Sequence, residues 1–243
     1  MPDITTFVQE ISLLNDEITK YYRGLEAEKG KAIYDGIVNK EEYYASPVKI
    51  LWILKEPYDK DNEGESEWNL ADLLGTEDFL DDIGGATTTW HPIIYTTFSI
   101  LNNINYDDMD FIKDNPSMVD VLKKVAFMNI HKFPAGTTSK NSEISAAYSR
   151  DKTILLKQIE TYKPDIVIGG NVMHNFIDDL GLKDYGNYKE YEYWIKDRRL
   201  YIDANHPAYP KSGEAKEAYT DDILRIVRLF NEQNSTDETT RPN

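Results

Sequence analysis

Polar side chains that can handle charge follow four separate apolar runs of this chain. The four segments are Lys55-Glu56-Pro57 after 48–54, Asn129-Ile-His131-Lys132 at the end of 125–130, Gly169-Gly170-Asn171 after 166–168, and Asn205-His206-Pro207 after 200–204. A carboxylate can stabilise a cation or orient a water, an imidazole can donate a hydrogen bond to developing negative charge, and an amide can read an amide-like edge. The recurrence of such groups at the ends of apolar runs indicates one polar site.

Three of these residues have two interpretations each. Glu56 is either a carboxylate held in a low-dielectric pocket or a loop carboxylate that caps a helix. Asn129 either reads a ligand edge or ties down neighbouring backbone. His206 is either a structural or exposed imidazole or a hydrogen-bond donor to an anion, and its place after an apolar run, with Pro207 stiffening the exit, favours the donor. The residue types alone leave both interpretations open at each position.

The elements that would position these side chains follow from hydrophobic periodicity. Phe7, Ile11, Leu14, Ile18 and Tyr22 recur at intervals of three and four, which predicts a helix over 3–25. Continuous apolar runs predict buried strands, and further periodic or boundary signals predict helices. The expected strands are 48–54, 125–130, 166–168, 191–195 and 200–204, and the expected further helices are 70–74, 92–104, 116–124, 142–162, 172–180 and 212–231.

Alternating strands and helices predict an α/β fold in which helices cover both faces of a short parallel sheet. Ligands of such sheets bind beyond the carboxyl ends of the strands, which is where the polar segments fall. No internal repeat or linker divides the sequence, so we expect a single domain over 1–232 and a polar tail over 233–243.

The composition excludes several kinds of site. The chain has 243 residues and no Cys, which rules out disulfides, thiolate metal sites and a Cys nucleophile. The four His residues show no metal-ligand spacing, and neither a Gly-x-Ser-x-Gly nor a Gly-x-Gly-x-x-Gly motif is present. Gly169-Gly170-Asn171 before a helix favours tight strand-to-helix packing over an anion site. We therefore expect no metal and no cofactor.

The charge is strongly acidic and unevenly distributed. The net charge is −16, and residues 59–82 hold ten acidic residues and one Lys, a local charge of −9. This balance counts against a nucleic-acid partner, although a basic surface elsewhere is compatible with it. The segment following Met1 lacks the basic and apolar parts of a signal peptide, and no apolar stretch is long enough to span a bilayer, so we expect a cytoplasmic protein without a membrane partner.

The four strand ends, taken in order, resemble the uracil-DNA glycosylase superfamily over about residues 48–210. Leu54-Lys-Glu-Pro-Tyr58 is similar to the acidic-Pro-Tyr segment of that family, and Phe127-Met-Asn129 is similar to its strand ending in Asn. His206-Pro-Ala208 resembles its late His-Pro-Ser segment, and 163–170 resembles its intervening strand. The resemblance implies a three-layer α/β/α sandwich around a four-stranded parallel sheet.

The resemblance also implies an activity: hydrolysis of the N-glycosidic bond of uracil or another damaged base flipped out of DNA. Glu56 and His206 would be catalytic, Glu56 by stabilising the sugar cation or holding water and His206 by hydrogen-bonding the departing base. Pro57, Tyr58 and Asn129 would bind the substrate, with Asn129 reading the base edge and Tyr58 forming a pocket wall. The partner would then be DNA that carries such a base.

Two further hypotheses fit the same fold. Leu54-Lys55 stands where the family has Gly-Gln, and Ala208 stands where it has Ser, which favours a non-catalytic protein that keeps its pocket for a nucleobase-like or nucleotide ligand. The acidic residues of 59–82 favour an interaction module that contacts a basic protein or mimics the charge of DNA.

Overall fold

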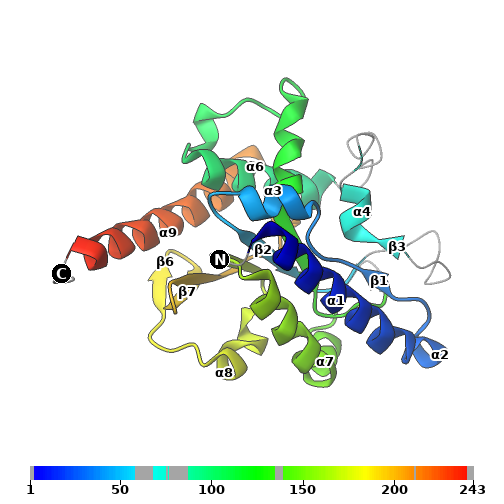
Figure 1. The fold of residues 1–243 in the computed structure, drawn as a ribbon. Helices are drawn as coiled ribbons and strands as arrows, with labels where there is room; N and C mark the ends of the chain where they lie inside the picture. The colour runs from blue at the N-terminus through cyan, green and yellow to red at the C-terminus, as the bar shows by residue number, and fades with distance from the viewer. Residues whose placement is uncertain are drawn as a thin grey trace. The chain divides into compact units, whose positions relative to one another are not determined.

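The structure is a computed structural model that describes residues 3–57, 68–74, 76, 87–134, 139–210 and 212–239. It is a mixed α/β protein whose chain forms two compact units. The first unit contains 1–79 and 122–164, and the second contains 80–121 and 165–243. Each unit is described by itself, with the element labels of Figure 1.

The first unit contains two pairs of parallel strands and the helices around them. Its elements are α1 (Ile4–Arg23), α2 (Glu26–Lys29), β1 (Ile33–Tyr34), α3 (Lys40–Ala45), β2 (Ile50–Leu54), β3 (Trp68–Asn69), α4 (Leu70–Leu74), β4 (Val125–Asn129) and α7 (Asn141–Tyr162). Strand β1 pairs with β3, and β2 pairs with β4. Every residue of β2 and of β4 is buried, as their continuous apolar runs predict for strands covered on both faces.

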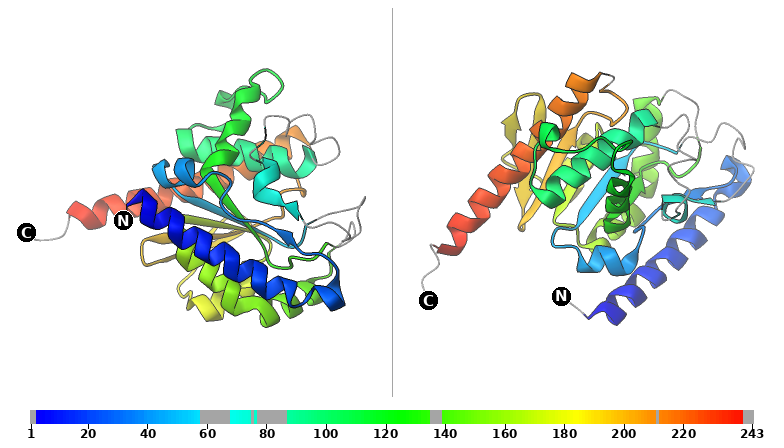
Figure 2. Two further views of the ribbon diagram at one scale, coloured as in Figure 1. Left: turned by 45° about the vertical axis from the view of Figure 1, so that its right-hand side comes forward. Right: turned by 90° about the horizontal axis from the view of Figure 1, so that it is seen from above.

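Helix α1 has the buried face that its periodicity predicts, and its bounds lie within two residues of the predicted range 3–25. The Asp3 carboxylate caps it by accepting hydrogen bonds from the backbone N–H groups of Thr5 and Thr6 at 3.0 and 3.1 Å. The five residues of the predicted apolar face are all buried. Helices α1 and α7 lie side by side (Figures 1 and 2), and Tyr21 on α1 donates a hydrogen bond to Asp151 on α7.

The second unit combines two parallel strands with an antiparallel extension. Its elements are α6 (Thr87–Asn102), η1 (Tyr106–Asp108), β5 (Ile166–Gly170), η3 (Met173–Asn175), α8 (Ile177–Leu180), β6 (Gly186–Tyr188), β7 (Tyr191–Lys196), β8 (Arg199–Ala204) and α9 (Gly213–Thr239). Strand β5 pairs with β8 in parallel, and β7 pairs with both β8 and β6 in antiparallel fashion. The expected strands over 166–168, 191–195 and 200–204 are therefore all present. Helices α6 and α9 of this unit lie side by side (Figure 2).

Three expected helices differ from the structure. The segment 116–124 forms a 3₁₀ helix, η2 (Pro116–Lys124), in place of the expected α-helix. The expected helix over 172–180 is divided into η3 and α8. The segment begins after Asn171, which is in the left-handed conformation (φ 59°), and Asp203 accepts hydrogen bonds at the start of η3. Helix α9 continues beyond the expected end at Asn231, through most of the segment expected to be a polar tail.

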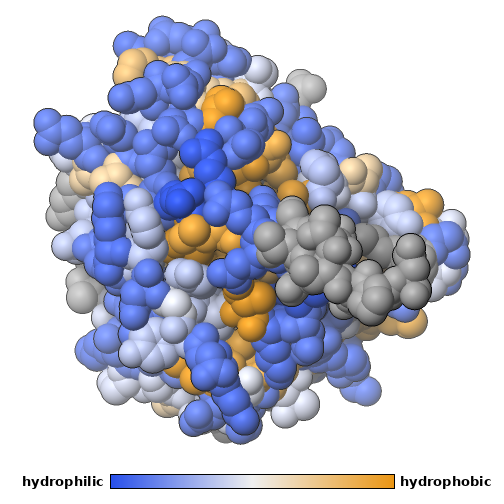
Figure 3. All heavy atoms as spheres, turned by 90° about the vertical axis from the view of Figure 1, so that its left-hand side faces the viewer, coloured by the Kyte–Doolittle hydropathy of each residue, from blue (hydrophilic) through white to orange (hydrophobic). Residues whose placement is uncertain are grey.

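The close packing expected at Gly169 is present. A Cβ at this position would lie 2.6 Å from Met173 Cγ and 2.9 Å from its Sδ, so a larger residue would require the Met173 side chain to move. Hydrophilic residues cover most of the face shown in Figure 3, with hydrophobic residues between them. Within the described ranges, no helix has the length and apolar character needed to cross a membrane.

Candidate active site

The carboxyl ends of β2 and β4 bring two of the predicted site residues together. The two strands are in register from Ile50 opposite Val125 to Leu54 opposite Asn129. Pairing continues past the strands, where the N–H of His131 donates to the Lys55 carbonyl at 2.9 Å. Lys55, the residue before Glu56, is therefore hydrogen-bonded to His131, the second residue after Asn129.

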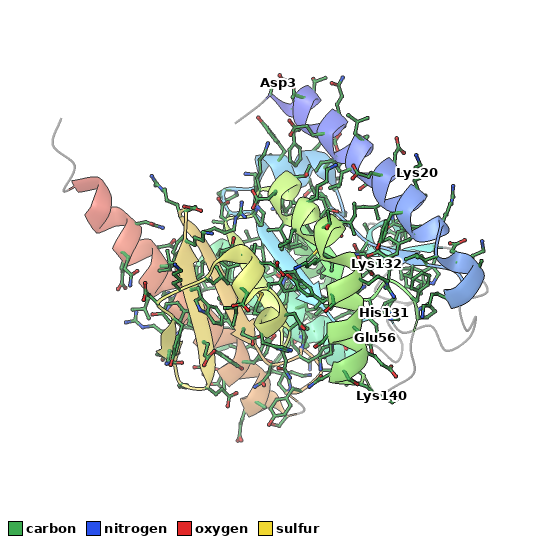
Figure 4. The ribbon with its side chains drawn as sticks, turned by 90° about the horizontal axis from the view of Figure 1, so that it is seen from below. Asp3, Lys20, Glu56, His131, Lys132 and Lys140 are labelled. Carbon is green, nitrogen blue, oxygen red and sulfur yellow. The ribbon has the colours of Figure 1, made fainter. Side chains whose placement is uncertain are left out.

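Glu56 is a partly buried carboxylate with a raised pKa. Burial is the largest cause of the rise, and the carboxylate of Glu143 adds to it, whereas a hydrogen bond from Ser139 and the charge of Lys55 act in the opposite direction. Its Oε2 atom is buried and has no hydrogen-bond partner among the described residues. Such an oxygen has acceptor capacity for a water or a substrate group. The labels of Glu56, His131 and Lys132 lie near one another in the view of Figure 4.

Asn129 is held by its backbone at the same strand end. The residue is 2% exposed, and its N–H donates to Asp35 Oδ2 at 2.7 Å. Asp35 also forms a buried ion pair with Lys132, whose Nζ lies 2.7 Å from each carboxylate oxygen. The position of Asn129 is thus fixed by a charged side chain that lies far away in the sequence.

His206 belongs to the second unit, where it follows β8. Its Nδ1 accepts a hydrogen bond from the N–H of Ala208 at 3.2 Å. A neutral ring that accepts at Nδ1 carries its proton on Nε2, so Nε2 is the atom that donates. The adjacent Asn205 is anchored, because its side chain donates to Glu190 at 2.7 Å and its carbonyl accepts from the Tyr219 hydroxyl at 3.1 Å.

The predicted site residues therefore divide between the units. Glu56, the buried Pro57 and Asn129 lie in the first unit, at neighbouring strand ends. His206 lies in the second unit, and Tyr58 lies outside the described residues, as do 58–67 and most of 75–86 from the acidic segment.

Sequence reasoning did not select Asp35 or Ser139, and it noted His131 and Lys132 only as polar neighbours of Asn129. His131 is partly buried, and its pKa is lowered, first by burial and then by the positive charge of Arg150. For His131 and Lys132, the sequence does carry a signal, because the two polar residues stand side by side directly after a buried strand. No local pattern marks Asp35, because its partner Lys132 is 97 residues away.

Each unit also has a pocket of its own. The pocket of the first unit has a volume of about 350 Å³ and is lined by Asn15, Ile18, Thr19, Arg23, Tyr34, Asp35, Trp68, Asn69 and Asp72. The pocket of the second unit, about 370 Å³, is lined mainly by residues 181–196. Neither is lined by Glu56, Asn129 or His206. In the part of the chain that the structure describes, no three acidic or His side chains gather to hold a metal ion.

Comparison with known proteins adds no family. No protein-family model matches the chain, and no curated protein matches its sequence.

Proposed function

We propose that this protein is a uracil-DNA glycosylase-like hydrolase that cleaves the N-glycosidic bond of uracil or another damaged base in DNA. The observation that carries the proposal is the partly buried carboxylate of Glu56, with one unpartnered oxygen, at the end of a strand that pairs with the strand ending in Asn129. The proposed fold is the three-layer α/β/α sandwich of that superfamily around a four-stranded parallel sheet, and the parallel pairs β2–β4 and β5–β8 support it.

The proposed chemistry assigns one role to each residue. Cleavage leaves a sugar with oxocarbenium character and a departing base with negative charge. The Glu56 carboxylate stabilises the cation or orients the attacking water through its unpartnered Oε2. The Asn129 amide reads the edge of the base, and Pro57 and Tyr58 border the base. His206 donates from Nε2 to the oxygen on which negative charge develops, in the tautomer that its bond from Ala208 favours.

The charge of the chain constrains how DNA would bind. At a net charge of −16, a duplex is repelled except where basic residues face it. Single-stranded substrate also avoids the cost of extruding the base from a duplex. We therefore expect single-stranded DNA to be the better substrate and the rate to depend strongly on salt.

The direct experiment incubates the protein with uracil-containing single- and double-stranded oligonucleotides and scores abasic sites. We expect turnover by the wild-type protein and a loss of about 100-fold or more for Glu56→Gln and for His206→Ala. Glu160→Gln and His174→Ala change an exposed Glu and an exposed His elsewhere, and both should keep wild-type turnover. No cleavage by the wild-type protein, or unchanged cleavage by both site variants, would refute the proposal.

One observation favours a second function, binding of a nucleobase-like ligand without cleavage. The pocket of the first unit combines the aromatic side chains of Trp68 and Tyr34 with the amides of Asn15 and Asn69, and Asn15 Oδ1 is a buried acceptor without a donor among the described residues. Free uracil and adenine should raise the melting temperature of the protein, and Trp68→Ala should abolish the shift. Absence of any shift at millimolar ligand would exclude this function.

A further inference from the structure

We propose that Asp35 is a positioning residue, whose carboxylate fixes the segment 129–132 so that Asn129 meets its substrate in one geometry. The inference rests on the proposed function, because it assigns Asp35 a role at that same site. Asp35 directly follows β1 and touches the end of β4 through its side chain.

The contacts of Asp35 converge on the residues that border the site. Its Oδ2 accepts from the Asn129 N–H at 2.7 Å, and both of its oxygens lie 2.7 Å from Lys132 Nζ. Its Oδ1 also accepts from Gln158 Nε2 on α7 at 3.3 Å. The carboxylate thus holds both ends of the segment 129–132 and ties it to helix α7.

The backbone holds the same two segments together. The Ile33 N–H donates to the Lys132 carbonyl at 2.8 Å, and the Phe127 N–H donates to the Gly36 carbonyl at 2.9 Å. The segment around Asp35 is therefore aligned with the end of β4 independently of its side chain. The carboxylate adds a strong, directional contact at Asn129 itself, since hydrogen bonds to ionised acceptors are stronger than neutral ones.

Stability alone does not explain this arrangement. The side chains of Asp35 and Lys132 are both 0% exposed. Replacing such a buried ion pair by apolar residues of similar size is often neutral or stabilising, because the desolvation of both charges offsets their attraction. A pair that gains little stability but holds the backbone of Asn129 is suited to positioning, and displacement of a substrate-reading group by 1 Å can cost about 100-fold in rate.

Two double variants separate positioning from charge and burial. Asp35→Asn with Lys132→Met removes both charges but keeps an oxygen that can accept from the Asn129 N–H. Asp35→Leu with Lys132→Met removes both charges and the acceptor, while Leu keeps the branched shape and the number of side-chain heavy atoms of Asp. Tyr22→Phe, which removes a buried 3.2 Å hydrogen bond to Asp151 in the same unit, is the matched control.

The experiment measures uracil excision together with the NMR signal of the Asn129 amide. With the Asp35→Leu pair, kcat should fall at least about tenfold with little change in KM, and the Asn129 amide proton should shift upfield. With Tyr22→Phe, both readouts should stay near those of the wild-type protein. With the Asp35→Asn pair, both should lie between those of the wild-type protein and the Asp35→Leu pair, because a neutral acceptor remains. Equal kcat and equal amide shifts for the two double variants would overturn the inference.

The amide signal keeps this test separate from that of the proposed function. Should the wild-type protein cleave no uracil, the proposed function fails, and the Asn129 amide shift alone then decides whether Asp35 fixes the segment. Should a double variant not fold, hydrogen exchange in the wild-type protein decides instead. An Asn129 amide protected as strongly as those of Phe127 and Met128 supports the inference, and a rapidly exchanging one overturns it.

Discussion

Removal of the positive charge of Lys132 should strongly destabilise the protein at neutral pH. Lys132 Nζ lies 2.7 Å from Asp35, and neither side chain is exposed. At that separation and an effective dielectric constant of about 20, the attraction is ~6 kcal/mol. Lys132→Met leaves the Asp35 carboxylate buried without its counter-charge, for which we expect a loss of about 3–5 kcal/mol in the free energy of unfolding.

Urea unfolding followed by circular dichroism measures this loss. The urea midpoint of Lys132→Met should fall by about 1–2 M if the slope of the transition is unchanged. The double variant Asp35→Asn/Lys132→Met should return to within about 1 kcal/mol of the wild-type protein, because it removes both charges from the interior and keeps an acceptor for the Asn129 N–H. A loss below about 1 kcal/mol for Lys132→Met, or a double variant less stable than the single one, would refute the reasoning.

Three further predictions concern Glu56, Asp203 and Gly186. Burial raises the pKa of Glu56, so the folded protein favours the protonated form of this side chain. The stability that protonated Glu56 contributes is present below its pKa in the unfolded chain and is lost as pH rises through its pKa in the folded protein. Urea unfolding should therefore show Glu56→Gln to be more stable than the wild-type protein at pH 7 and equally stable near pH 3. Asp203 accepts hydrogen bonds from the N–H groups of Val172 and Met173 at 3.1 Å each. Asp203→Ala should therefore lower the free energy of unfolding in urea by about 1–3 kcal/mol. Asp203→Asn keeps an acceptor and should lower it less in the same assay. A Cβ at Gly186 would lie 2.3 Å from Tyr193 Cζ, so Gly186→Ala should cost about 1–3 kcal/mol in thermal unfolding, whereas Gly213→Ala, with nothing within 4 Å, should cost far less.

The sequence predicts those parts of the fold that depend on local pattern. Strands β2 and β4 lie where continuous apolar runs place them, because strands covered on both faces need no polar alternation. Helix α1 buries its predicted face, because its apolar residues recur at the helical period. The end of each strand, and hence the places of Glu56 and Asn129, follows from where each run stops.

The remaining features depend on contacts between distant segments. The Asp35–Lys132 pair joins residues 97 apart, and nothing in the neighbourhood of either residue indicates the other. The start of η3 has the left-handed Asn171 before it and hydrogen bonds from 172 and 173 to Asp203, which is 30 residues or more further along. Local periodicity over 172–180 carries no information about either contact.

The most direct test of the central claim is a double-mutant cycle on Glu56 and His206 in single-turnover uracil excision from single-stranded DNA. If both residues stabilise one transition state, each single variant loses at least about 100-fold, and the double variant loses far less than the product of the two losses. Independent, fully multiplicative losses would contradict coupled roles of the two residues in one transition state. Failure of the wild-type protein to release uracil would contradict the assignment as a whole.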